Sequence, residues 1–185
     1  MRIVSGRFKG RVLSSFKADH IRPTTDRVKE TLFNKWMTQI GDAKVLDLFA
    51  GTGNLGIESL SRGCAHVDFV EKNLKSIDIL KKNIDLLKIE KSEYNIYKQD
   101  VLVYLKNYQG LTYDLILADP PFTEKMAHEV MLALDSSACF RENTLIAIES
   151  QKKERMDEAY THLYRYDFKD YGDKVLSFFT KKAQD

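Results

Sequence analysis

The strongest constraint on the fold is a regular alternation of short apolar runs and longer amphipathic segments between residues 44 and 149. Units of strand, helix and strand place successive strands parallel, with helices on both faces of the sheet. The alternation therefore predicts an α/β domain with a largely parallel sheet. Strands are predicted at Lys44–Leu48, His66–Val70, Tyr94–Lys98, Tyr113–Ala118 and Thr144–Glu149, and helices at Asn54–Ser61, Asn73–Lys88, Val101–Tyr108 and Glu124–Asp135.

The two ends of the chain depart from this alternation. Residues 1–16 are typical of a short β-hairpin, and residues 24–40 predict a helix because apolar residues recur there at every fourth position. Near the other end, Tyr160–Phe168 and Lys174–Thr180 are aromatic-rich and are separated by the turn Tyr171–Asp173. Two strands joined only by a turn must pair antiparallel. The predicted sheet therefore ends in an antiparallel pair.

Positive charge is concentrated in the first part of the chain. Residues 1–40 hold nine Lys or Arg and three Asp or Glu, whereas the other 145 residues hold 20 and 24. A basic arm on a mildly acidic body favours binding of a polyanion such as nucleic acid. A solvated basic face without a partner is the alternative.

Several classes of protein are disfavoured by features that the sequence lacks. The first residues contain no apolar segment typical of a secretory signal, and no run of apolar residues is long enough to span a membrane. Cys64 and Cys139 lie far apart without a CxxC spacing, so we expect two reduced thiols in a cytoplasmic protein. The four histidines have no ligand-like spacing, and no metal is expected. They are His20, His66, His128 and His162.

A glycine-rich loop follows the first predicted parallel strand. Gly51 and Gly53 remove side chains where a ligand must approach the backbone. Glu71 ends the next strand, 20 residues after Gly51, where its carboxylate can accept hydrogen bonds from both hydroxyls of a ribose. This pattern also fits a dinucleotide site, and a tight turn without any ligand is the simpler alternative.

Two further carboxylates refine the ligand. Asp47 precedes the glycines, where a negative charge would repel a dinucleotide's pyrophosphate but would suit the ammonium and sulfonium of S-adenosylmethionine. A turn-capping role is the alternative for Asp47. Asp100 closes the third strand and can accept a hydrogen bond from an adenine amine, can cap the following helix, or can do both.

A rigid corner follows the fourth predicted strand. Pro120 and Pro121 fix the backbone and leave carbonyl groups exposed in a fixed direction. Asp119 adds an acceptor and Phe122 adds a flat apolar ring. The set fits a planar base with an NH2 group, whose hydrogens the acceptors bind while the ring stacks on the base. An ordinary turn with a core phenylalanine is the alternative.

The two motifs together resemble the amino-group methyltransferases that use S-adenosylmethionine. Asp-Leu-Phe-Ala-Gly-Thr-Gly follows the first strand, and Asp-Pro-Pro-Phe follows the fourth. Further segments resemble the RsmD family in particular, over about residues 1–180. These segments are Arg2–Gly6, Arg22–Asn34, Leu55–Gly63 and Tyr171–Asp173.

The resemblance implies a Rossmann-like class I methyltransferase sheet, mostly parallel with an antiparallel C-terminal strand, plus the N-terminal hairpin. We expect a basic hairpin over residues 1–20 and a methyltransferase domain over residues 21–185. The implied reaction is methyl transfer from S-adenosylmethionine to the exocyclic N2 of a guanine in small-subunit (16S) ribosomal RNA, with S-adenosylhomocysteine as product. The expected partner is ribosomal RNA or an assembling small subunit, and a cytoplasmic monomer away from membranes is expected.

Three groups of residues are the candidates for function. The candidate catalytic residues are Asp119, Pro120, Pro121 and Phe122. The candidate cofactor-binding residues are Asp47, Phe49, Ala50, Gly51, Thr52, Gly53, Glu71, Lys72, Asp100 and Val101. The candidate RNA-binding residues are Arg7, Lys9, Arg11, Arg22 and Arg27. Thr24 and Thr25 could line the methionine end of the cofactor, and the sequence leaves their role open.

Three other functions explain part of the pattern. A nicotinamide oxidoreductase accounts for the glycines but not for the Asp-Pro-Pro-Phe corner. A non-catalytic RNA-binding module accounts for the basic arm but not for Glu71, Asp100 and the loop together. An adenine-N6 methyltransferase of DNA or RNA uses the same corner, but usually needs an added target-recognition segment, for which 185 residues leave little room.

Overall fold

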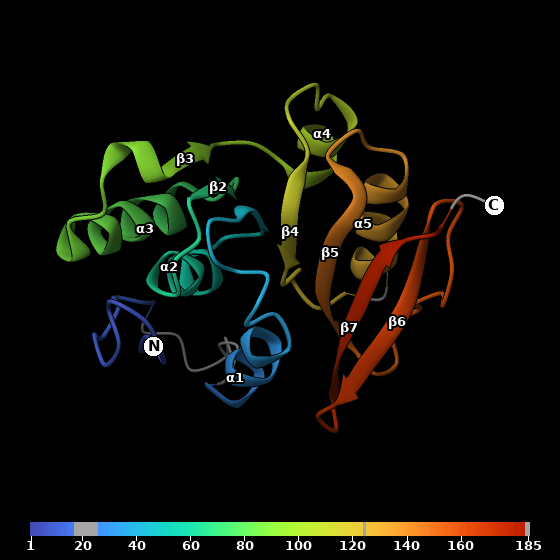
Figure 1. The fold of residues 1–185 in the computed structure, drawn as a ribbon, viewed down its shortest axis with the longest axis horizontal. Helices are drawn as coiled ribbons and strands as arrows, with labels where there is room; N and C mark the ends of the chain where they lie inside the picture. Colours follow the sequence, from blue (N-terminus) through green and yellow to red (C-terminus); the bar gives the residue numbers. More distant parts are fainter. Residues whose placement is uncertain (17–25, 124, 184–185) are drawn as a thin grey trace.

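The computed structural model describes residues 1–16, 26–123 and 125–183, which form a seven-stranded sheet covered by helices (Figure 1). The strand order is β3-β2-β1-β4-β5-β7-β6. The strands are β1 Lys44–Leu48, β2 His66–Val70, β3 Tyr94–Tyr97, β4 Tyr113–Ala118, β5 Phe140–Gln151, β6 Leu163–Asp170 and β7 Lys174–Lys181. The helices are α1 Asp26–Lys35, α2 Asn54–Ser61, α3 Leu74–Leu87, α4 Val101–Lys106 and α5 Met126–Asp135, with a short 3-10 helix η1 at Lys91–Glu93.

The sheet is parallel from β3 to β5, and β7 pairs antiparallel with both β5 and β6. Successive residues of a strand point to opposite faces, so each central strand supplies two cores. Val45 and Leu117 pack on the face covered by α1, α2 and α3, whereas Leu46 and Ile116 pack on the face covered by α4 and α5. This two-sided burial explains the nearly continuous apolar runs of the central strands.

The predicted alternation of strands and helices is confirmed, including the antiparallel end of the sheet. The bounds of β1, α2, β2 and β4 match the prediction, and those of most other elements differ by a few residues. The main error concerns the helix predicted over 24–40, which ends at Lys35. The apolar stripe continues in the turns that follow, where Trp36 and Ile40 are buried. Residues 24 and 25, and Glu124 at the predicted start of the helix over 124–135, lie outside the described part of the chain.

Other differences come from strand pairing. β5 has 12 residues, twice the predicted length. Its start pairs with β4 through Phe140 and Tyr113, and its last seven residues pair with β7, a pairing that extends beyond the end of its pairing with β4. β6 begins at Leu163 rather than at Tyr160, which is held by a hydrogen bond from its N–H to the Leu163 carbonyl. Within the described residues, no helix combines the length and apolar character that membrane crossing needs.

The N-terminal hairpin is present but reduced to a single β-bridge, between Arg2 and Val12. Its apolar side chains Ile3 and Leu13 belong to the core formed with α1, α2 and α3. The Arg7 N–H donates to the carbonyl of Ser61, the last residue of α2. The hairpin therefore runs along α2, with its tip near the C-terminal end of that helix.

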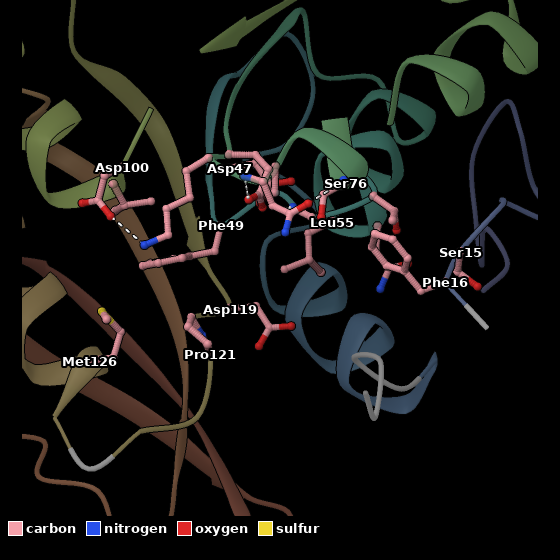
Figure 2. A pocket seen from close by; sticks show the side chains of 18 of the residues that line it. Ser15, Phe16, Asp47, Phe49, Leu55, Ser76, Asp100, Asp119, Pro121 and Met126 are labelled. Atoms are coloured by element: carbon pink, nitrogen blue, oxygen red, sulfur yellow. Dashed lines mark hydrogen bonds and ion pairs between the residues drawn. The ribbon is translucent and has the colours of Figure 1, made fainter. Parts of the chain in front are cut away.

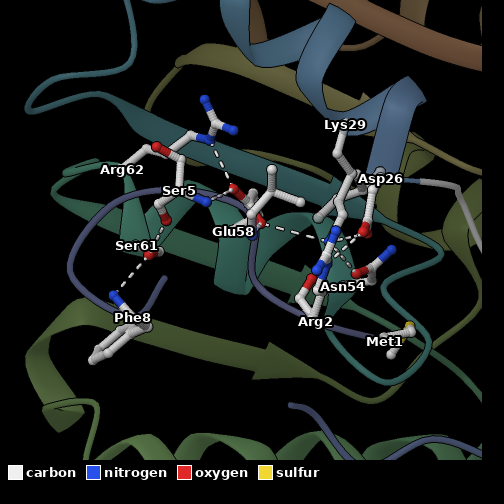
Figure 3. Close-up of polar contacts among 12 residues, drawn as sticks. Met1, Arg2, Ser5, Phe8, Asp26, Lys29, Asn54, Glu58, Ser61 and Arg62 are labelled. Atoms are coloured by element: carbon white, nitrogen blue, oxygen red, sulfur yellow. Dashed lines mark hydrogen bonds and ion pairs between the residues drawn. The ribbon is translucent and has the colours of Figure 1, made fainter. Parts of the chain in front are cut away.

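A buried carboxylate joins the hairpin to the rest of the domain (Figure 3). Glu58 of α2 is fully buried and accepts hydrogen bonds from the backbone N–H groups of Val4 and Ser5, at 2.9 and 3.0 Å. Its oxygens also lie 2.8 Å from Arg62 Nε and 3.5 Å from the buried Lys29 Nζ. The hairpin is thus tied to the core by polar contacts as well as by apolar packing. The division into a hairpin over 1–20 and a domain over 21–185 stays a prediction.

Candidate functional site

A pocket of about 670 Å³ lies at the carboxyl ends of β1, β2, β3 and β4 (Figure 2). In the view of Figure 2, Asp100 and Met126 lie at one end, Ser15 and Phe16 at the other, and Asp119 and Pro121 along the lower side. Ligands of open α/β sheets bind at this edge. The pocket is lined by eleven of the candidate cofactor-binding and catalytic residues: Asp47, Phe49, Ala50, Gly51, Thr52, Glu71, Lys72, Asp100, Val101, Asp119 and Pro121.

The glycine loop is held against the end of β2 by a carboxylate. The Gly51 N–H donates to Glu71 Oε2 at 2.9 Å, and the Asn73 N–H donates to Glu71 Oε1 at 2.7 Å. A carboxylate has about four acceptor positions, so Glu71 keeps acceptors for a ligand. Gly51 has a φ of +55°, and a Cβ added there would meet nothing closer than the Phe49 carbonyl oxygen at 3.8 Å. The loop therefore leaves open space beside a fixed acceptor.

Gly53 serves the fold of the loop. It precedes α2 with a φ of +91°, and a Cβ added there would lie 2.4 Å from Leu80 Cδ1. Gly53 is buried and is absent from the residues that line the pocket. Backbone conformation and close packing therefore require glycine at position 53. The predicted role of Gly53 in cofactor binding stays a prediction.

Asp47 carries a buried carboxylate at the floor of the pocket. The side chain is only 2% exposed, and its Oδ2 accepts a hydrogen bond from the Gly56 N–H at 2.8 Å. Burial raises the pKa of Asp47 to about 8, and the nearby charges of Asp119 and Glu71 act in the same direction. Burial therefore favours the neutral form of Asp47 at neutral pH, whereas a cationic ligand would favour the ionised form.

We expect Asp47→Asn to stabilise the ligand-free protein progressively, relative to wild type, as the pH rises from about 4 to about 8. In this window the folded state of wild type keeps the Asp47 proton while the unfolded state loses it, so the free energy of unfolding falls as pH rises. Asparagine keeps an oxygen acceptor for the Gly56 N–H and does not titrate. Urea unfolding of both proteins at pH 5 and pH 8.5 measures the effect. If the difference in free energy of unfolding between variant and wild type is the same at both pH values, the prediction is contradicted.

Asp100 caps α4 and also faces the pocket. Its Oδ1 accepts from the Leu102 N–H at 3.0 Å, and its Oδ2 accepts from Lys72 Nζ at 3.0 Å. The hydrogen bond from Lys72 lowers the pKa of Asp100, with the Leu102 N–H acting in the same direction. The carboxylate is thus ionised and held between the ends of β2 and β3. The capping role is confirmed, and the adenine contact stays a prediction.

The Asp-Pro-Pro-Phe corner is only partly exposed to the pocket. Asp119 and Pro121 line it, whereas Pro120 is buried. Phe122 is 38% exposed, and Lys174 Nζ of β7 lies 4.5 Å from the centroid of its ring. The structure therefore brings an acidic acceptor of the corner to the same cavity as the glycine loop, whereas Phe122 is absent from the residues that line this cavity and its role in stacking stays a prediction.

The structure separates the basic residues of the hairpin from the pocket. Arg7 pairs with Glu93, and Arg11 donates to the Leu86 carbonyl at 3.5 Å, near the C-terminal ends of α2 and α3. Lys9 is exposed on the same hairpin tip. The pocket lies at the opposite ends of these helices, where Asn54 and Ser76 line it.

The remaining predicted RNA contacts are spread over other parts of the chain. Arg27 of α1 lies over the ring of Tyr171, 5.9 Å from its centroid, and so lies beside the turn between β6 and β7. Arg22, Thr24 and Thr25 lie outside the described residues. The proposed roles of the basic residues in RNA binding stay predictions.

Several residues that line the pocket were not among the candidates predicted from the sequence. They are Met1, Ser15, Phe16, Asn54, Leu55, Asn73, Ser76, Gln99 and Met126. Phe16 follows the hairpin, whose positive charge pointed to RNA and gave no signal for a pocket. Buried Asn83 of α3 explains how this segment is held, because its Nδ2 donates to the Ser14 and Thr52 carbonyls at 3.0 and 2.9 Å. The sequence signal for this contact is the polar Asn83 on the apolar face of the helix predicted at Asn73–Lys88.

Comparisons with known proteins agree with this geometry. The profile of the family described as "Conserved hypothetical protein 95" matches residues 1–180. The chain is 38% identical to ribosomal RNA small subunit methyltransferase D of Haemophilus influenzae, over 82% of this chain and 79% of the relative. It is 32% identical to the Escherichia coli protein of the same name, over 82% and 75%. The solved structure of yhhF from Escherichia coli superimposes with a TM-score of 0.87 at 31% identity, covering 100% of this chain and 99% of that one.

Proposed function

The chain belongs to the family Conserved hypothetical protein 95, and from this premise we propose that it methylates the exocyclic N2 amine of a guanine in 16S ribosomal RNA. The prediction of the RsmD family is confirmed, as is the Rossmann-like class I methyltransferase fold. The names of the relatives support methylation of small-subunit ribosomal RNA. The Asp-Pro-Pro-Phe corner supports an exocyclic base amine as the methyl acceptor, and the choice of guanine N2 rests on the resemblance to the RsmD family alone.

The pocket fits S-adenosylmethionine as the methyl donor. Its volume of about 670 Å³ lies within the range of small-molecule sites. Asp47 suits the cationic end of the molecule, Glu71 the ribose hydroxyls, and Asp100 the adenine amine, while Phe49 and Leu55 add apolar walls. When bound, S-adenosylmethionine supplies a methyl group on a positively charged sulfur that nucleophiles attack directly. The proposed reaction needs no covalent bond to the protein.

The corner acts on the methyl acceptor. A base amine is conjugated with its ring and is a poor nucleophile. Asp119 and a carbonyl of the adjacent prolines bind the amine hydrogens, which favours a pyramidal nitrogen with an available lone pair. These hydrogen bonds strengthen as positive charge develops on the nitrogen, so they stabilise the transition state more than the ground state. The methylated nitrogen is strongly acidic, and its proton leaves readily to Asp119 or to water.

One observation carries this proposal: Asp119 and Pro121 line the same pocket as Asp47, Glu71 and Asp100. The acceptor for a base amine and the set suited to S-adenosylmethionine therefore face one cavity, where two bound reactants are held in a fixed orientation. Such orientation contributes up to about 7–11 kcal/mol to lowering a barrier. The arrangement supports a methyltransferase over an RNA-binding module without chemistry.

The proposal is tested by transfer of a tritiated methyl group from S-adenosylmethionine to small ribosomal subunits from cells that lack this enzyme. We expect label in 16S ribosomal RNA, and none in subunits already methylated by the enzyme. Protein-free 16S RNA and an assembled subunit are compared to identify the preferred substrate. Label in duplex DNA but not in ribosomal RNA would overturn the proposal in favour of the adenine-N6 alternative.

The hairpin tip is expected to contribute to RNA binding through charge. The triple variant Arg7→Gln, Lys9→Gln and Arg11→Gln should weaken RNA binding and make its dependence on salt shallower, by about 0.7 in the logarithmic slope for each lost phosphate contact. Substitution is the appropriate test because deletion of residues 1–16 would remove Ile3 and Leu13 from the core. Filter binding at several salt concentrations measures the slope. Lys106→Gln, on α4 across the sheet, is the control, and an unchanged slope in the triple variant would contradict this role.

A further inference from the structure

Lys174 connects the C-terminal strands to the Asp-Pro-Pro-Phe corner. It is the first residue of β7 and pairs in register with Gln151, at the carboxyl end of β5. Its ammonium group lies 4.5 Å from the centroid of the Phe122 ring and donates a hydrogen bond to Glu149 Oε1. One lysine side chain therefore contacts both a partly exposed aromatic ring of the corner and a buried carboxylate of β5.

Glu149 gives this lysine a fixed position. Glu149 is 3% exposed and the Lys174 side chain is 16% exposed, so the pair is largely removed from solvent. A buried carboxylate needs a partner, because an isolated charge is costly in a medium of low dielectric constant. Burial and the nearby charge of Asp119 raise the pKa of Glu149, while Lys174 favours its ionised form. The lysine thus also offsets negative charge that gathers beside Asp119.

The contact with Lys174 restrains a partly exposed ring, that of Phe122. With 38% of its surface exposed, the ring is not enclosed by the core. An exposed aromatic side chain populates several rotamers when nothing restrains it. Stacking of a base would then cost the conformational entropy of fixing the ring in one of them. The ammonium group over one face restricts the ring, which keeps 38% of its surface exposed. A cation also draws π density from the ring, which reduces its repulsion with an electron-rich purine.

We propose that Lys174, anchored by Glu149, is a positioning residue that holds the Phe122 ring as a preformed stacking surface for the target base. The inference rests on the proposed function for the identity of that base, but the restraint on the ring is a property of the protein alone. The two statements are therefore tested by different measurements.

The restraint is tested without substrate. The full chain is prepared with 4-fluorophenylalanine at position 122 only, and its ¹⁹F NMR signal is compared in wild type, Lys174→Met and Lys174→Arg. Methionine keeps an apolar chain without the charge, whereas arginine keeps a cation that can lie over a ring. We expect a shifted and narrower signal in Lys174→Met and a signal close to wild type in Lys174→Arg. An unchanged signal in Lys174→Met would overturn the proposal.

The effect on the reaction is tested by kinetics with small ribosomal subunits. Lys174→Met is expected to raise KM for the subunit about tenfold, with kcat and affinity for S-adenosylmethionine little changed, and Lys174→Arg to restore most of the loss. In a Phe122→Leu background, Lys174→Met should have no further effect, because the ring it positions is gone. Equal effects in both backgrounds would contradict the proposal.

Stability is controlled separately, because Lys174→Met leaves Glu149 buried without its partner. The double variant Glu149→Gln with Lys174→Met removes both charges and should unfold at a temperature close to that of wild type. If it keeps the altered ¹⁹F signal and the raised KM, loss of folding is excluded as the cause. If it returns both to wild-type values, the proposal is wrong. Absence of any methyl transfer by wild type would refute the proposed function, while the NMR result would still decide the role of Lys174.

Discussion

Replacing Asp119 with alanine is expected to lower kcat for methylation of the small subunit by about 10²–10³-fold or more, the usual cost of removing one preorganised group that stabilises developing charge. In the proposed mechanism, the variant loses the carboxylate that binds the amine hydrogens as positive charge develops on nitrogen. Asp119 lines the pocket but belongs to the corner after β4 and not to the glycine loop. Affinity for S-adenosylmethionine, measured by calorimetry, should therefore stay close to that of wild type, and single-turnover assays measure the chemical step.

The controls for this prediction lie on the same strand. Asp114→Ala, at the amino end of β4, removes a carboxylate that contacts Lys44 and Arg141 far from the pocket, and should leave kcat unchanged. Asp119→Asn keeps an oxygen acceptor without the charge and should fall between wild type and Asp119→Ala. Loss of cofactor binding in a folded Asp119→Ala protein would contradict the account and make Asp119 a cofactor residue.

Replacing Glu58 with alanine is expected to destabilise the protein by about 3–5 kcal/mol, the usual cost of breaking a buried ion pair from one side. The substitution leaves Lys29, which is 1% exposed, without its closest carboxylate. It also removes the acceptor for the Val4 and Ser5 N–H groups that attaches the hairpin. Burial lowers the pKa of Lys29, so this side chain would shift further toward its neutral form. Urea unfolding at constant pH measures the change.

A surface ion pair provides the matched control for Glu58. Asp167→Asn breaks the pair between Lys35 and Asp167, whose side chains are 29% and 31% exposed, and should cost no more than about 1 kcal/mol. Glu58→Gln keeps one acceptor for the hairpin and should cost less than alanine. Equal losses in Glu58→Ala and Asp167→Asn would show that the buried cluster is not the attachment described here.

The parts of the fold that the sequence predicted well are those fixed by local pattern. The bounds of β1, α2, β2 and β4 follow from apolar runs that begin and end at turn residues. The strands among them are apolar throughout because their alternate residues are buried in the two cores. Strand ends also place Asp47, Glu71, Asp100 and Asp119 at one edge of a parallel sheet. Their convergence on one pocket could therefore be predicted from topology alone.

The parts that could not be predicted depend on contacts between distant segments. The direction of the hairpin along α2 is decided by Glu58 and by the Ser61 carbonyl, and no pattern within residues 1–16 encodes it. The same holds for Phe16, which reaches the pocket because Asn83 holds Ser14. No sequence pattern distinguishes Lys174 from the other basic residues. The pairing of β5 with β7 places it beside Phe122.

The most direct test of the central claim identifies the methylated nucleoside. Small ribosomal subunits from cells lacking this enzyme are incubated with the protein and S-adenosylmethionine, the RNA is digested to nucleosides, and the products are separated and identified by mass spectrometry. The account predicts new N2-methylguanosine, which establishes the base, the position and the substrate class together. New N6-methyladenosine in place of N2-methylguanosine would contradict the assignment of the target base while leaving the fold and the methyl donor in place.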